Sequence, residues 1–112
     1  MRIVLLNAFP LNAFPFNTFT ALFCRVSVDQ LVSEVKQSSE IISYIRHEAT
    51  VKLLNKLLGI ELKPSTDIYK FSEHDLIYVI TLKRVERGKE VVEVKVEDLD
   101  IVRVVVVEGA WI

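Results

Sequence analysis

The chain is poor in the residues that usually build metal centres and disulfides. Its one cysteine, Cys24, excludes an internal disulfide, and its two histidines, His47 and His74, lie far apart. No cysteines or histidines have the spacing of a zinc or iron–sulfur site. We therefore expect neither a metal nor a cofactor. We also expect Cys24, which stands in a β-like run, to be a buried apolar residue.

Long hydrophobic runs are also missing. No stretch approaches the ~20 apolar residues that span a bilayer. The apolar segment after Arg2 is interrupted by Asn7, Pro10, Asn12 and Pro15, which is unlike a signal peptide. We expect a cytoplasmic protein that makes no contact with a membrane.

Neither sign of charge dominates. The 112 residues include 14 Lys and Arg against 15 Asp and Glu, which gives a net charge of −1. Such a chain has no global positive field to hold a long nucleic acid. A small anionic ligand bound by a few local cations is compatible with this balance. Apolar residues make up 51%, enough for one core, and we expect a single domain over residues 1–112.

The apolar patterning predicts an α/β fold. Residues 47–58 place leucines at helical spacing before Gly59, and Ser27 with Gln30 forms a capping box before a shorter helix. Runs of β-branched and aromatic residues predict strands at 2–6, 19–28, 67–71, 76–83, 91–97 and 101–107, with a hairpin turn at 72–75. We expect a mixed sheet of five or six strands with helices packed mainly on one face.

A pentad repeats near the start of the chain. Leu-Asn-Ala-Phe-Pro occurs at 6–10 and 11–15, and a worn third copy follows at 16–19. The prolines predict an extended loop over residues 7–17. Asn7 and Phe9 could contact a nucleotide through an amide and a stacked ring. Alternatively, the phenylalanines fill the edge of the core.

The start of the long helix is the first candidate for chemistry. His47 is expected at its N-terminus, where backbone N–H groups and the helix dipole suit phosphate oxygens. Arg46 adds a cation, and Thr50 lies one turn further on. The alternative interpretation of His47 is a surface or capping residue.

A charged loop after a predicted strand is the second candidate. Residues 83–89, Lys-Arg-Val-Glu-Arg-Gly-Lys, carry four cations and one carboxylate. Arg84 and Arg87 could bind an anion, with Glu86 as an acid or base. The alternative is a solvated loop.

Three segments together resemble a known family: LLNAFP at 5–10, YIRHEATVKLLNKLLG at 44–59, and LKRVERGK at 82–89. In this order and spacing they are similar to the viral anti-CRISPR ring nuclease family, small proteins of archaeal viruses and their hosts. The family is typified by proteins of Sulfolobus rod-shaped and turreted icosahedral viruses. The resemblance covers residues 2–90.

The resemblance implies a homodimer that binds cyclic tetra-adenylate across its two-fold axis and cleaves it without metal, countering type III CRISPR signalling. It implies that His47 is catalytic, with Glu86 as the nearby carboxylate, and that Arg84 holds phosphate. A histidine suits this role because it exchanges protons near neutral pH. The implied ligand-binding set is Asn7, Phe9, Arg46, Thr50, Arg84 and Arg87.

Several positions depart from the family pattern. Arg46 stands where the family usually has glycine, the family's Glu-Gly pair is Arg87-Gly88 here, and Glu86 is displaced by one residue. Pro10, Ala49 and Thr66 replace two serines and an arginine. The alternative hypotheses are a cyclic-oligoadenylate or nucleotide binder without catalysis, and a protein-interaction module.

Overall fold

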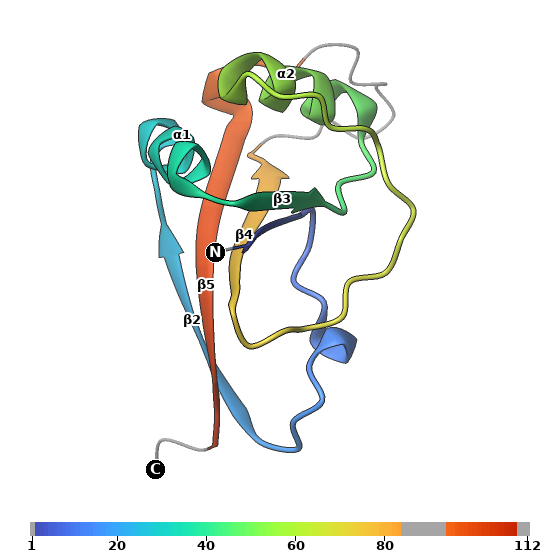
Figure 1. The fold of residues 1–112 in the computed structure, drawn as a ribbon, viewed down its shortest axis with the longest axis vertical. Helices are drawn as coiled ribbons and strands as arrows, with labels where there is room; N and C mark the ends of the chain where they lie inside the picture. The colour runs from blue at the N-terminus through green and yellow to red at the C-terminus, as the bar shows by residue number, and fades with distance from the viewer. Residues whose placement is uncertain (1, 84–93, 110–112) are drawn as a thin grey trace.

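The computed structural model describes residues 2–83 and 94–109, and within them it forms one mixed sheet. The strands are β1 (Arg2–Leu6), β2 (Phe19–Arg25), β3 (Glu40–Ser43), β4 (Asp75–Leu82) and β5 (Leu99–Glu108). They lie in the order β2-β5-β4-β1-β3 (Figure 1). Strand β1 is parallel to β3 and β4, whereas β5 is antiparallel to β4 and β2. The predicted mixed α/β architecture is confirmed.

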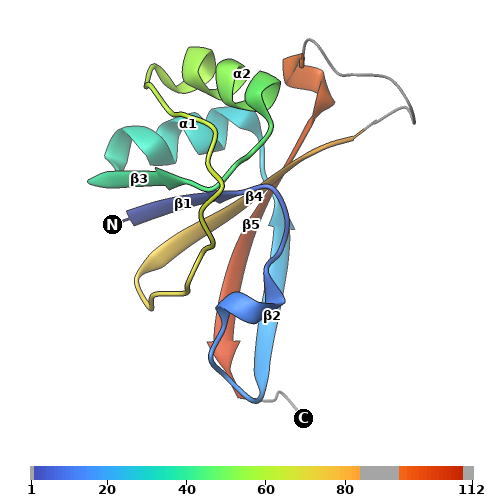
Figure 2. The ribbon, with the colours of Figure 1, turned by 90° about the vertical axis from the view of Figure 1, so that its right-hand side faces the viewer.

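Both helices cover the same face of the sheet, α1 (Val28–Gln37) and α2 (Glu48–Leu58) (Figure 2). Leu31 of α1 and Leu54 of α2 pack in one cluster with Ile3 and Leu5 of β1. Side chains alternate along a strand, so Val4 and Leu6 face the opposite side, and they too are buried. The central strand β1 is therefore covered on both faces, which is why it reads as a continuous apolar run.

The opposite face is covered by loops that carry aromatic rings. Phe14, from the second pentad, is buried against this face, and its ring centroid lies 5.2 Å from that of Phe9 and 5.0 Å from that of Phe71. Of the two interpretations of the repeat, this packing supports the one in which phenylalanines fill the core. Part of the loop, η1 (Leu11–Ala13), is a 3-10 turn, so the expectation of a wholly extended loop is wrong.

The predicted helix boundaries are confirmed by their caps. Ser27 Oγ accepts a hydrogen bond from the Gln30 N–H at 3.1 Å, and Gln30 Oε1 accepts one from the Ser27 N–H at 2.9 Å. Gly59 ends α2 at φ +66°, a left-handed conformation that glycine adopts without steric cost. Because Ser27 caps α1, strand β2 ends at Arg25, three residues before the predicted end.

Three strand predictions need correction. Residues 67–71 form no strand, so residues 72–75 are not a hairpin turn. The alternation that suggested a strand buries Tyr69 and partly buries Phe71 on the face opposite the helices, while Ile68 is exposed. The edge position beside β1 is taken by β3, which was not predicted. Residues 94–97 are not a strand, and η2 (Val96–Asp98) is a 3-10 turn; residues 91–93 lie outside the described part.

Cys24 also departs from its expected place. It lies on the edge strand β2 and is exposed, not buried. Its run of β-branched and aromatic neighbours correctly indicated a strand. The run could not indicate that the strand lies at the border of the sheet.

Candidate functional site

The carboxyl ends of the three parallel strands meet at one edge of the sheet. Asn7 follows β1, Arg46 and His47 follow β3 by a few residues, and Lys83 follows β4. In open α/β sheets this edge is where ligands usually bind, because loops converge there and helix N-termini face it. Parallel pairing thus gathers residues from widely separated parts of the sequence.

A pocket of about 290 Å³ opens at this edge. Asn7 and Arg46, two of the predicted ligand-binding residues, both line it. The remaining wall comes from the loop after β1, from Tyr44, and from the segment between α2 and β4: Leu6, Ala8, Pro10, Asp67, Ile68 and Tyr69. The pocket therefore combines an amide, a guanidinium and aromatic rings, a set that suits a small nucleotide.

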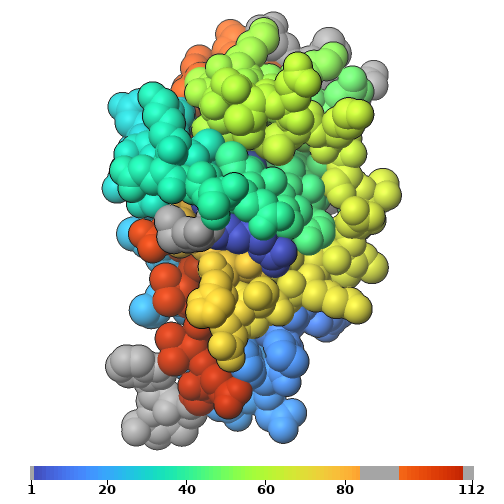
Figure 3. Space-filling view, viewed as in Figure 1, coloured from blue at the N-terminus to red at the C-terminus, as the bar shows by residue number. Residues whose placement is uncertain are grey.

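The segment between α2 and β4, residues 60–74, forms one side of the pocket. It runs down the side of the molecule from α2 toward the pentad loop (Figure 3). The Ser65 N–H donates to the Ile45 carbonyl at 3.0 Å, and the Phe71 N–H donates to the Ala13 carbonyl at 3.0 Å. The first bond attaches the segment to the residue before Arg46, and the second attaches it to the loop after β1.

His47 is the residue immediately before α2, as predicted, and its side chain is exposed. Its ring does not cap the helix; instead Nδ1 lies 2.9 Å from Thr50 Oγ1, in hydrogen-bonding distance. Thr50 is only 3% exposed, so its hydroxyl is directed to His47 and not open to a ligand. The contact occupies Nδ1, which leaves Nε2 as the ring nitrogen for any contact with a ligand.

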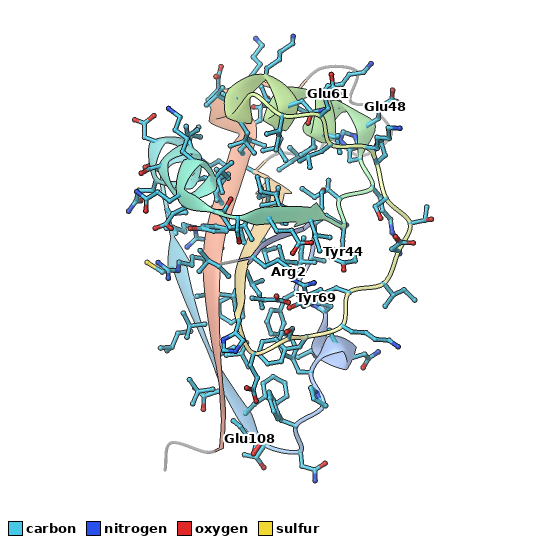
Figure 4. The ribbon with its side chains drawn as sticks, viewed as in Figure 1. Arg2, Tyr44, Glu48, Glu61, Tyr69 and Glu108 are labelled. Atoms are coloured by element: carbon cyan, nitrogen blue, oxygen red, sulfur yellow. The ribbon has the colours of Figure 1, made fainter. Side chains whose placement is uncertain are left out.

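A partly buried ion-pair network lies behind the pocket. Asp75 Oδ1 accepts from Arg2 Nε at 2.6 Å, and Asp75 Oδ2 accepts from Arg2 Nη2 at 2.7 Å and from Tyr69 Oη at 2.6 Å. Figure 4 shows Arg2 and Tyr69 close together near the centre of the molecule, with Tyr44 beside them. Tyr69 also packs edge-on against Tyr44, with ring centroids 5.4 Å apart.

The network shifts the protonation of its members. Burial opposes ionisation of Asp75, but hydrogen bonds from Arg2 and Tyr69 outweigh it and lower the pKa of the carboxyl. Burial, and then the hydrogen bond to Asp75, raise the pKa of the Tyr69 hydroxyl. The carboxylate is therefore ionised and the phenol neutral near neutral pH.

The structure brings together only part of the predicted site. Asn7 and Arg46 share the pocket, and His47 with Thr50 follows Arg46 directly. Phe9 does not line the pocket but stacks in the aromatic cluster. Arg84, Glu86 and Arg87 lie outside the described residues, and Lys83, which follows β4, is the described residue before them.

Sequence reasoning missed the aromatic and acidic wall of Tyr44, Asp67 and Tyr69. Because residues 67–71 were interpreted as a strand, the sequence did not indicate that Asp67 and Tyr69 line a pocket. The pairing of Arg2 with Asp75, 73 positions apart, has no local signal, because it arises from the register of β1 with β4.

Over residues 2–83 and 94–109, no three His, Cys, Asp or Glu side chains are grouped as metal ligands. None of the helices in the same ranges has the length and apolar character needed to cross a bilayer.

Fold and pocket define a small α/β protein with a mixed five-stranded sheet and a ligand-sized pocket at the carboxyl ends of its parallel strands. The STIV B116-like family matches residues 3–105, and the chain belongs to this family. Among solved structures, B116 of Sulfolobus turreted icosahedral virus is similar, with 22% sequence identity and a TM-score of 0.67. The match covers 93% of this chain and 98% of that one. No curated protein matches the sequence.

Proposed function

We propose that the protein binds cyclic tetra-adenylate and cleaves it without a metal ion, which switches off type III CRISPR signalling in the cytoplasm of an infected archaeal cell. The observation that carries the proposal is the adjacency of Arg46 and His47. Arg46 lines the pocket with Asn7, and His47 stands next to it at the N-terminus of α2. A phosphate between them would meet a guanidinium, backbone N–H groups and a proton donor.

The chemistry requires alignment and one proton donor. The ribose 2′-oxygen attacks the neighbouring phosphorus while the bond from phosphorus to the 5′-oxygen breaks, leaving a 2′,3′-cyclic phosphate. The imidazolium of His47 gives its proton to the departing 5′-oxygen, and the 2′-hydroxyl proton passes to solvent. Thr50 holds the ring so that Nε2 faces the leaving oxygen.

The charged residues after β4 would contribute further to phosphate binding and proton transfer. Arg84 and Arg87 would neutralise phosphate charge, and Glu86 would accept the 2′-hydroxyl proton on its way to solvent. A ring of four equal units has two-fold symmetry, so two copies of this chain would match it with two equivalent sites. We therefore propose a homodimer, which light scattering of the protein with and without the ring would test.

The decisive experiment uses labelled cyclic tetra-adenylate in EDTA. We expect the wild type to cleave the ring and His47→Ala to retain it without cleavage. The matched control is His74→Ala, because His74 is exposed in the turn before β4 and has no assigned role. Equal cleavage by wild type and His47→Ala would refute the catalytic assignment.

A second function remains as the alternative outcome of the same experiment. Arg46 in the pocket favours anion binding, whereas the carboxylate Glu86 is one residue from its family position. Tight retention without cleavage by the wild type would make the protein a binder that sequesters the ring. Absence of both binding and cleavage would favour a protein-interaction module.

A further inference from the structure

The 60–74 segment builds much of the pocket wall although it has no regular secondary structure. Asp67, Ile68 and Tyr69 line the pocket, and Ile68 is 81% exposed. Within this wall Tyr69 is the inward-facing residue, only 3% exposed. The position of the wall therefore depends on what holds Tyr69.

Tyr69 is held by a group that belongs to the sheet. Its hydroxyl donates to Asp75 Oδ2 at 2.6 Å. Asp75 is the first residue of β4 and lies directly opposite Arg2 in the parallel pairing with β1. Arg2 binds both carboxylate oxygens, and such a two-point contact fixes orientation as well as distance. The register of β1 with β4 therefore fixes the carboxylate that accepts the hydrogen bond from the Tyr69 hydroxyl.

Tyr69 also contacts Tyr44, a second aromatic residue that lines the pocket. The Tyr69 ring packs edge-on against Tyr44, which follows β3 and lies two residues before Arg46. The Tyr44 N–H donates to the Leu5 carbonyl of β1 at 2.8 Å. Both aromatic residues are therefore attached to β1, Tyr69 through Asp75 and Arg2, and Tyr44 through Leu5.

We infer that Tyr69 is a positioning residue: its hydrogen bond to the Arg2–Asp75 pair holds the 60–74 segment in the shape that binds the ligand. The hydroxyl donates to Asp75 of the sheet and takes no part in the proposed proton transfer. Its removal should increase the motion of the segment and weaken binding, because the ligand must then order the wall. The rate of bond cleavage in the bound complex should not change.

The test compares Tyr69→Phe with Tyr78→Phe. Both variants remove one hydroxyl from a buried tyrosine, but Tyr78 lies in the core on the helix-covered face, away from the pocket. Hydrogen–deuterium exchange of peptides covering 61–71 measures the segment. We expect about tenfold faster exchange at the Ser65 and Phe71 amides in Tyr69→Phe, and wild-type exchange there in Tyr78→Phe.

The functional measurement separates binding from chemistry. With cyclic tetra-adenylate, Tyr69→Phe should raise KM or Kd about tenfold with kcat unchanged. Arg2→Lys, which keeps the charge but loses the two-point contact, should shift both measurements in the same direction by a smaller amount. Adding Tyr69→Phe to Asp75→Ala should change neither measurement further, because the acceptor of the bond is already removed.

Two results would overturn the inference. One is unchanged exchange at 61–71 in Tyr69→Phe, and the other is a fall in kcat without a rise in KM. The inference rests on the proposed function only for the identity of the ligand. If the wild type neither binds nor cleaves the ring, the proposed function fails, and the exchange measurement alone decides whether Tyr69 holds the segment.

Discussion

Nδ1 of His47 and Oγ1 of Thr50 are 2.9 Å apart, across the first turn of α2. The threonine is buried and the histidine exposed, so the contact fixes an exposed ring to the rigid interior. In histidines that transfer protons, a partner on one nitrogen determines what the other can do. The position of Thr50 in the sequence suggested that it contacts a phosphate. In the structure Thr50 is better placed to orient His47.

Thr50→Val should lower the rate of ring cleavage about tenfold while leaving ring affinity nearly unchanged, because one orienting hydrogen bond is lost. Thr50→Ser keeps the hydroxyl and should retain most of the activity. Single-turnover cleavage and equilibrium binding measure the two quantities. Wild-type turnover in Thr50→Val would show that the contact does not orient the catalytic ring.

Arg46→Ala should weaken binding of the ring about tenfold and reduce the salt dependence of binding, since a charge-assisted contact to phosphate is removed. Arg25→Ala is the control, because Arg25 is exposed, pairs with Asp100 and lies on β2, the border strand farthest from β3. Titrations at two salt concentrations make the comparison. An equal loss in both variants would argue against a specific role for Arg46.

Asp75→Asn should destabilise the fold by about 2 kcal/mol at pH 7, because it removes the charge of a carboxylate that accepts three hydrogen bonds. The folded-state pKa of Asp75 lies below its ordinary value of 3.8. The carboxylate therefore adds stability above pH 3.8, and this addition is lost as pH falls through the lower folded-state pKa.

Urea denaturation of wild type and Asp75→Asn between pH 7 and 2 measures this effect. The difference between the two unfolding free energies should shrink as pH falls below about 4. Asp67→Asn is the control, since Asp67 is exposed, and its unfolding free energy should stay within about 0.5 kcal/mol of wild type. A difference for Asp75→Asn that is constant with pH would contradict the ionic role.

Phe14→Ala should lower the free energy of unfolding by about 3 to 4 kcal/mol, because the ring fills the aromatic cluster beneath the sheet. Phe23→Ala, at a ring that is 58% exposed, should cost less than about 1 kcal/mol. Urea unfolding at neutral pH compares them. Similar losses in the two variants would mean that the second pentad does not close the core.

Local patterns in the sequence predicted much of this fold. The capping box at Ser27 and the glycine stop at 59 depend on contacts within a few residues, so the helix ends could be predicted. Strand β1 and the histidine before α2 were predicted for the same reason. The alternation at 67–71 was misread, because Tyr69 and Phe71 turned inward produce the same pattern in an irregular segment as in a strand.

The sequence by itself determined the α/β class, the caps, the family resemblance and the candidate pair Arg46 and His47, since each depends on spacing along the chain. Only the tertiary structure decided that Phe14 closes the core, that Thr50 turns toward His47, and that Arg2 and Asp75 meet across β1 and β4. Strand order and register place residues 73 positions apart in contact, and no pattern within one segment encodes them. The shape of the pocket wall therefore depends on contacts between strands, which no single segment of the sequence specifies.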